Sequence, residues 1–266
     1  DGDNDGKKAF HGKNSIGGSL IFDGNTIRNM TDWFVMDNTS SQNDVAYALE
    51  YVAFNNNTLE NVHGSIAFRG HPENAIDYAE VIGNTANYGS TLNNFWASIE
   101  VNNASYIEAA YNEIHGIRAA NQSGSWGDWG EHHALQFWNN VGAWTLDVHD
   151  NDLSGNDQGI AMATNGNYVV PGGSIYNNNL SDITEFAITA ELWGPGDGDC
   201  GDDPGARVNA ENNYFGNTGS LSSWTTSTAT CWVDAEPFYL DAAMTTLATQ
   251  DCAGVYEGDA LADDCQ

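Results

Sequence analysis

One arrangement of apolar and polar positions recurs seven times: an apolar residue, two free positions, an asparagine, one free position and a second apolar residue. Its asparagines follow one another at intervals of 32, 27, 28, 39, 27 and 35 residues. A period in this range predicts a repeat protein, in which each unit buries its apolar face only against a stacked neighbour. The seven asparagines are Asn25, Asn57, Asn84, Asn112, Asn151, Asn178 and Asn213.

The apolar spacing around these asparagines favours short strands over helices. Apolar residues lie one or two apart, as in Tyr51–Phe54 and Leu146–Val148, and asparagine, aspartate and glycine punctuate them. Asparagine tolerates the left-handed conformation and its amide can bond to nearby backbone, so we expect the repeated asparagine to form a sharp corner. Stacked coils would bring successive asparagines about 4.8 Å apart in a hydrogen-bonded ladder. The predicted fold is an all-β parallel solenoid.

The pattern also divides the chain. We expect an acidic N-terminal lead-in at 1–17, the solenoid at 18–240 and a C-terminal cap or tail at 241–266. Within the solenoid, a loop containing Trp33 and Phe34 follows the first coil, and residues 119–141 form the largest insertion. Second strands of individual coils are predicted near 65–68, 116–118, 159–161 and 186–188.

Between Gly18 and Leu240 the repeated phrase, the coil length and the asparagine corner resemble the right-handed parallel β-helix repeat proteins, the pectate-lyase-like superfamily. The segments Asn212–Gly216 and Pro237–Leu240 resemble the closing coil of such proteins. The resemblance implies a single-stranded right-handed parallel β-helix of about seven to eight coils with loop insertions. Since this superfamily contains lyases, hydrolases, epimerases, phage tailspikes and adhesins, the fold does not select a function.

The cysteines indicate an oxidising compartment. All four lie in the last third of the chain, in no zinc-binding spacing, and an even number in a polar, glycine-rich region favours disulfides that staple the C-terminal cap. Three pairings are open, of which Cys200–Cys231 with Cys252–Cys265 is the local one. The chain has no apolar run long enough to span a membrane and no signal peptide, so we expect a mature, secreted or cell-surface protein without membrane insertion.

Six Asn-x-Ser/Thr sequons offer glycosylation positions in such a compartment, although a chain rich in these residues also produces sequons by chance. They begin at Asn29, Asn38, Asn56, Asn103, Asn121 and Asn179.

A net charge of −30 restricts the partners. Such a field repels nucleic acid, anionic membranes and polyanionic polysaccharides, and it favours divalent cations and neutral or basic partners. Solubility of a secreted protein accounts for the charge equally well.

Two acidic loops are candidate Ca²⁺ sites, and no organic cofactor is predicted. The first contains Asp1, Asp3 and Asp5 before Gly6, but position twelve is Gly12 where an EF-hand has glutamate. The second contains Asp197, Asp199 and Asp202. The alternative for the first loop is a solvated acidic terminus, and the alternative for the second is a turn held by a disulfide.

The insertion at 119–141 is the best candidate for a binding or catalytic site, because long loops in compact domains are often functional. The rings of Trp126, Trp129 and Trp138 could stack on sugars. Asp128, Glu131, His132 and His133 could serve acid–base chemistry. Alternatively, the aromatic side chains clamp the loop onto the solenoid. The two histidines are adjacent, so on a strand they would point to opposite faces and could not bind one metal ion together.

The catalytic groups that the resemblance implies are largely missing. Lyases of this fold use lysine or arginine, yet only Arg69 and Arg118 lie in mid-solenoid and no lysine follows residue 13. The segment His115–Arg118 is similar to part of a hydrolase pattern, without its following lysine and in the wrong order. The remaining catalytic alternative comprises Arg118, His115, His133, Glu131 and Asp128.

These observations favour a non-catalytic extracellular structural or cell-surface protein, such as a filament, surface-layer or adhesin-type subunit that self-associates end to end or side by side. The alternative is a secreted polysaccharide lyase, epimerase or glycoside hydrolase, or a glycan-binding fibre, that uses the insertion at 119–141.

Overall fold

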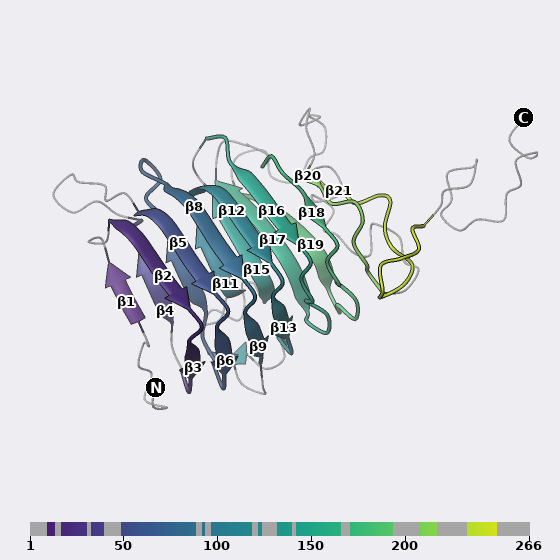
Figure 1. Cartoon of the computed structure of the whole chain (residues 1–266), viewed down its shortest axis with the longest axis horizontal. Coiled ribbons are helices and arrows are strands. Elements are labelled where there is room, and N and C mark those ends of the chain that lie inside the picture. Colours follow the sequence, from purple (N-terminus) through teal and green to yellow (C-terminus); the bar gives the residue numbers. More distant parts are fainter. Residues whose placement is uncertain are drawn as a thin grey trace, which may run out of the picture.

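A computed structural model shows an all-β parallel solenoid, and the residues it describes include no helix. The described residues are 10–13, 17–30, 33–39, 49–88, 92–93, 97–118, 122–123, 132–139, 142–165, 171–193, 208–216 and 233–248. Figure 1 shows the strands stacked along the long axis in sequence order, from purple to green. The predicted fold class is therefore confirmed.

Three parallel sheets form the walls, and each coil contributes strands to them in turn. Sheet A contains β1 (Phe10–Lys13), β4 (Phe34–Asp37), β7 (Ile66–Arg69), β11 (Ala97–Asn102), β15 (His133–Asn139), β17 (Gln158–Asn165) and β19 (Phe186–Trp193). Sheet B contains β2 (Gly18–Asp23), β5 (Leu49–Asn55), β8 (Ile76–Ile82), β12 (Ala104–Ala110), β16 (Thr145–His149) and β18 (Ile175–Tyr176). Sheet C contains β3 (Thr26–Arg28), β6 (Thr58–Glu60), β9 (Thr85–Asn87) and β13 (Glu113–His115). Two small parallel pairs join β10 (Leu92–Asn93) to β14 (Gln122–Ser123), and β20 (Val208–Asn209) to β21 (Val233–Asp234).

The core follows from the strand register, which stacks like residues from coil to coil. In sheet A, Ile66 aligns with Ile99, Leu135, Ile160 and Ile188, and all five are fully buried. Each such side chain contributes about 1.5–3 kcal/mol when it is removed from water. The apolar rows of the sheets thus form one continuous core along the solenoid axis.

The corner between sheets B and C carries the repeated asparagine, but the left-handed residue is the one before it. The preceding residue has a φ between 54° and 67° in all seven repeats. The expectation that the asparagine itself adopts this conformation is wrong, because its own backbone is needed to continue the ladder. These left-handed residues are Gly24, Asn56, Gly83, Tyr111, Asp150, Asn177 and Asn212.

The seven asparagines form the expected ladder. Asn112 Nδ2 donates to Asn151 Oδ1 at 2.8 Å and to the Val81 carbonyl at 2.8 Å, while its Oδ1 accepts from Asn84 Nδ2 at 2.9 Å and from the Asn84 N–H at 3.0 Å. The same donation to the next asparagine recurs along the ladder from Asn25 to Asn213. Each amide therefore fastens two coils and satisfies a buried backbone group.

Several boundaries differ from the sequence expectations. Strand β1 lies inside the expected lead-in at 1–17, β4 replaces the expected loop after Trp33, and β15 occupies the end of the expected insertion at 119–141. Residues 116–118 form no strand, because β15 supplies sheet A in that coil. The described residues make about five turns, and the expected seven to eight coils are not confirmed, since sheet C has strands in only four coils.

Candidate functional site

The outer face of sheet B carries two aligned columns of side chains, which we call the tyrosine–carboxylate face. It consists of Tyr51, Tyr78 and Tyr106 in one column and Glu80, Glu108 and Asp147 in the other. The columns arise because alternate residues of a strand share a face and parallel register repeats that face in every coil. The six side chains are partly buried and border solvent.

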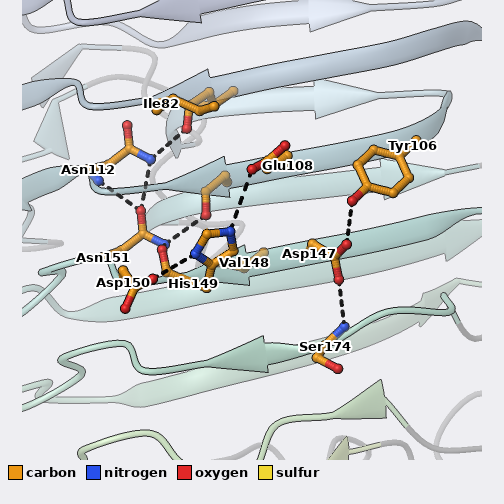
Figure 2. A network of polar contacts seen from close by, with 12 residues as sticks. Ile82, Tyr106, Glu108, Asn112, Asp147, Val148, His149, Asp150, Asn151 and Ser174 are labelled. Atoms are coloured by element: carbon orange, nitrogen blue, oxygen red, sulfur yellow. Dashed lines mark hydrogen bonds and ion pairs between the residues drawn. The ribbon is translucent and has the colours of Figure 1, made fainter. Parts of the chain in front are cut away.

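Each tyrosine hydroxyl donates to the carboxylate of the next coil. Tyr51 bonds to Glu80 at 2.6 Å and Tyr78 to Glu108 at 2.5 Å. Figure 2 shows the third pair, in which Tyr106 bonds to Asp147 while the other Asp147 oxygen accepts the Ser174 N–H at 3.1 Å. The pairs therefore run along the solenoid axis and tie neighbouring coils together.

The rings of this face also stack on one another. The centroids of Tyr51 and Tyr78 are 5.8 Å apart at an interplanar angle of 8°, and those of Tyr78 and Tyr106 are 5.0 Å apart. Stacking directs the ring faces along the solenoid axis, and Tyr78 has a neighbouring ring on each side. These tyrosines are therefore poorly placed to stack on a sugar, for which a free ring face is needed.

The hydrogen bonds affect the tyrosine acidities. The bond to Glu80 is the main cause that raises the pKa of Tyr51 to about 12, and the bond to Asp147 likewise raises the pKa of Tyr106 to about 12. Burial followed by the bond to Glu108 raises the pKa of Tyr78 further. Since the phenols stay protonated, they remain donors to the carboxylates at physiological pH.

His149 and its neighbours lie at the C-terminal end of the tyrosine–carboxylate face (Figure 2). His149 Nδ1 lies 2.9 Å from Asp150 Oδ2, and Nε2 lies 3.6 Å from Glu108 Oε1. Its ring stacks on Tyr176 at 5.0 Å and meets Tyr111 edge-on at 5.7 Å. Both ring nitrogens lie near carboxylates and the ring contacts two tyrosines, which makes His149 a bridging residue between coils.

The outer face of sheet A differs, and we call its central row, Glu100, Gln136 and Thr189, the covered polar row. Register aligns these residues with Ala67 and Ala161, and the three polar residues are at most 2% exposed. The core residues Ile99 and Val101 flank Glu100 in β11, so alternation places Glu100 on the outer face. Both faces of β11 are therefore buried.

Glu100 is held by an ion pair with two hydrogen bonds. Arg69 Nε and Nη2 each donate to a different Glu100 oxygen at 2.9 Å, and Asn102 Nδ2 donates to Oε1. The Arg69 guanidinium also lies 4.9 Å from the ring centroid of Trp33. Such two-point pairs are geometrically specific, and a buried charge that loses its partner is costly.

Three buried polar atoms of this face have no hydrogen-bond partner within the described structure: Asn102 Oδ1, Gln136 Oε1 and Thr189 Oγ1. Gln136 and Thr189 are two coils apart, about 9.6 Å at the usual strand spacing, with the short side chain of Ala161 between them. Unpaired buried polar atoms are rare and mark a site for ordered water or a ligand.

A second polar cluster lies just before strands β17 and β19 of sheet A. Arg118 Nη1 and Thr184 Oγ1 both donate to Asp157 Oδ1, at 2.9 and 2.5 Å. Burial lowers the pKa of His132, although the charges of Glu185 and Asp157 oppose that shift. The imidazole thus lies near two carboxylates and an arginine, but Asp157 is already occupied by its two donors.

The structure separates most of the catalytic alternative. Arg118 pairs with Asp157, whereas His115 Nδ1 lies 2.9 Å from the Ser154 carbonyl oxygen. His133 is 1% exposed, shares a strand face with core residues, and neither ring nitrogen has a partner among the described residues. Burial, together with the His132 charge, lowers the pKa of His133 to about 3.

Many of the expected site residues lie outside the described residues. They are Asp128 and Glu131 of the catalytic alternative, Trp126 and Trp129, the Ca²⁺ candidates Asp1, Asp3, Asp5, Asp197, Asp199 and Asp202, all four cysteines, and the sequon residue Asn121. Trp138 is described, in β15 beside the covered polar row. In the described part of the chain, no three or more histidine, aspartate or glutamate side chains are grouped to hold a metal.

The sequons fall in unequal surroundings. Asn103 is 3% exposed and donates through Nδ2 to the Gly70 carbonyl at 3.0 Å, and Asn38 is 1% exposed. Asn56 and Asn179 donate to Asp23 and Asp152 of neighbouring coils. Asn29, like Asn56, is exposed at a left-handed corner, and its Oδ1 accepts from Asn61 Nδ2 at 2.7 Å, whereas its Nδ2, the atom that would carry a glycan, donates to no described residue.

Sequence reasoning missed the tyrosine–carboxylate face and the covered polar row. The first had a visible signal: tyrosine stands six residues before Asn57, Asn84 and Asn112, and an acidic residue stands four residues before Asn84, Asn112 and Asn151. Glu100 had no such signal, because its partner Arg69 comes from another coil at an unrelated offset.

The described residues contain no helix that is long and apolar enough to cross a bilayer. Comparisons with protein families, curated proteins and solved structures found no match to this chain. The parallel solenoid is therefore established by the structure alone, and membership of the pectate-lyase-like superfamily is not supported.

Proposed function

We propose that the chain is an extracellular, non-catalytic β-solenoid that serves as a rigid structural or cell-surface element, of the filament, surface-layer or adhesin type. The observation that carries the proposal is the use of polar side chains along the axis. On the tyrosine–carboxylate face, each donor of one coil is paired with an acceptor of the next.

The asparagine ladder inside the solenoid also supports the proposal of a rigid element. Its amides join successive coils through two hydrogen bonds at every step, so bending one coil away from the next would break buried bonds. The aromatic stack of sheet B adds side-chain contacts in the same direction. These features stiffen the rod but leave no free acid–base pair on the described part of sheet B.

Localisation and particle shape test this proposal. We expect immunogold labelling of source cells to decorate their surface or a surface-attached layer, and negative-stain images of the purified protein to show straight, uniform rods. An Asn112→Ala variant should give bent or shortened particles, whereas Asn25→Ala, at the exposed end of the ladder, should not. Labelling confined to the cell interior, or turnover of a glycan by the purified protein, would refute the proposal.

A second candidate function is recognition of a neutral glycan at the outer face of sheet A. It rests on the unpaired atoms of Asn102, Gln136 and Thr189 near Trp138, which are buried in this structure and would accept hydrogen bonds from sugar hydroxyls only once this face is uncovered. The net charge of −30 disfavours polyuronides. Because Arg69 engages both oxygens of Glu100, binding is better supported than catalysis.

A neutral-glycan array tests this second candidate. We expect binding to fall at least about tenfold in Thr189→Val and Gln136→Ala, which corresponds to the loss of one or two hydrogen bonds. Glu108→Gln on sheet B is the control and should bind like the wild type. Absence of binding to every neutral glycan would assign the unpaired atoms to buried water.

A further inference from the structure

The N-terminal end of the solenoid is open within the described residues. Strands β1, β2 and β3 each pair with one neighbour, on the side that faces the next coil. The inward-facing Leu20, Phe22 and Ile27 of this coil are only partly buried. Their counterparts in the following coil, Val52, Phe54 and Leu59, are at most 4% exposed.

No described strand pairs with the free edge of β2. The Gly24 N–H donates to the Asn55 carbonyl at 3.0 Å, so alternation directs the backbone groups of Ser19, Ile21 and Asp23 to the open side. Native edge strands are usually blocked by lysine, proline or a covering segment. This strand reads Gly-Ser-Leu-Ile-Phe-Asp, and Ile21 is 60% exposed on its outer face.

The asparagine ladder is incomplete at the same end. Asn57 Oδ1 accepts both the Asn25 N–H and Asn25 Nδ2, at 2.9 and 3.0 Å. Asn25 Oδ1 accepts from no described residue, and Asn25 is exposed. The first coil thus presents an unfilled acceptor beside an unpaired strand and a partly exposed core.

The opposite end does not offer the matching surface. Tyr214 aligns with Tyr239, so Phe238 occupies the position in which the ladder asparagine after Asn213 would stand. Leu247 then pairs with Tyr239 in the antiparallel sense, and the Ala248 N–H donates to the Phe238 carbonyl at 2.8 Å. The ladder therefore ends in an apolar residue beside a segment that runs antiparallel to it, and head-to-tail stacking would not continue the ladder.

The charge distribution points to a contact between two N-terminal ends. Residues 1–28 contain four basic and four acidic side chains, whereas residues 29–266 contain three basic and 33 acidic ones. The whole net charge of −30 therefore belongs to the remainder of the chain. Two copies can meet at their N-terminal coils with the least like-charge repulsion.

We propose that two copies associate through their N-terminal coils, with β2 of one copy paired antiparallel to β2 of the other across a two-fold axis. The occupant of the open edge is thus a second copy of this chain. A two-fold contact is isologous and closed, so it produces a dimer about twice as long as one solenoid and no fibre. The inference depends on the fold and the charge distribution and does not rest on the proposed function; of the types proposed there, it excludes only a filament that grows end to end.

Mass measurements over a concentration series test the dimer. We expect light scattering and sedimentation to show the mass rising from 28.6 kDa towards twice that value as the protein concentration rises from about 1 to about 200 μM. The dimer should be weak because the contact involves only one end of the solenoid. Ile21→Pro removes an N–H that points to the open edge and breaks no bond to β5. It should weaken the dimer at least about tenfold.

A charge-matched pair of variants supplies the control. Ile21→Lys should abolish the dimer, whereas Ile82→Lys places the same charge on the outer face of sheet B two coils away and should leave it intact. Circular dichroism should show that all variants are folded. A monomer at every concentration, growth beyond two copies, or a dimer insensitive to both Ile21 substitutions would each overturn the inference.

Discussion

Sheets A and B have the same parallel backbone but opposite outer faces. On sheet B, tyrosines and carboxylates border solvent, and each is paired with a side chain of a neighbouring coil. On sheet A, Glu100, Gln136 and Thr189 are almost fully buried, and two of these three side chains lack a partner for one atom. The same scaffold therefore carries a satisfied polar face and an incompletely satisfied one.

The difference shows that the two outer faces use their polar side chains in different ways. Pairs that run along the axis use up side-chain polarity and leave little for a ligand. Buried atoms without partners do the reverse, since they cost stability in the absence of water or a ligand and contribute affinity in its presence. On the functions proposed above, the pairs of sheet B would stiffen the solenoid, whereas the unpaired atoms of sheet A would contact water or a ligand.

Removing the buried carboxylate of sheet A should have the largest effect. We expect Glu100→Ala to lower the free energy of unfolding by about 3–5 kcal/mol, because the largely buried Arg69 guanidinium would lose both hydrogen bonds to Glu100. Glu108→Ala on sheet B should cost less than about 1 kcal/mol, because its contacts border solvent. Urea denaturation measures both, and equal losses would show that the two faces do not differ in this way.

The buried histidine of sheet A should make stability depend on pH. Its pKa of about 3 in the folded state lies below the unfolded value of 6.5, so the folded state binds fewer protons. Stability should be complete above about pH 6.5 and fall towards pH 3, by at most about 1.4 kcal/mol per pH unit for this group. Thermal melts between these pH values measure the slope.

His133→Leu should remove this part of the slope and add about 1–3 kcal/mol at neutral pH, because no imidazole is then buried without a partner. His11→Leu changes an exposed histidine of the same sheet and should behave like the wild type. A variant as pH-dependent as the wild type would mean that His133 finds a partner or water in solution.

A substitution at the corner between sheets B and C should have a smaller effect on stability. Tyr111 has a φ of 56° and is 60% exposed, at a corner where the other repeats have asparagine, aspartate or glycine. Tyr111→Asn should stabilise the protein by about 0.5–1 kcal/mol, because asparagine adopts this conformation with less strain. Asn177→Tyr, the reverse change at the equivalent corner, should destabilise it similarly. If Tyr111→Asn destabilises instead, the edge contact with His149 outweighs the strain.

The sequence predicted the solenoid and its ladder because one backbone corner is repeated at every coil. It did not predict the outer face of sheet A, since the chain length between the corner and that sheet varies. Ala67 lies 10 residues after Asn57, Glu100 lies 16 after Asn84, and Gln136 lies 24 after Asn112. The three side chains align in space, yet their offsets from the preceding asparagine differ. The strand β15 was hidden for the same reason, inside what reads as an insertion.

The smallest expected effect concerns the acidity of the tyrosines of sheet B. The phenol of Tyr51 should titrate near pH 12, against an ordinary pKa of 10.0, chiefly because its hydroxyl bonds to Glu80. Since the folded pKa is raised, this bond stabilises the protein below pH 10 and its contribution disappears as the pH rises through 12. Ultraviolet difference titration of the wild type and Tyr51→Phe isolates the phenol. Glu80→Gln should lower its pKa towards 10, whereas Glu113→Gln, on sheet C, should not. A Tyr51 that titrates at pH 10 in the folded wild type would mean that the tyrosine–carboxylate pairs are not maintained in solution, and the rigid face of sheet B would lose its main support.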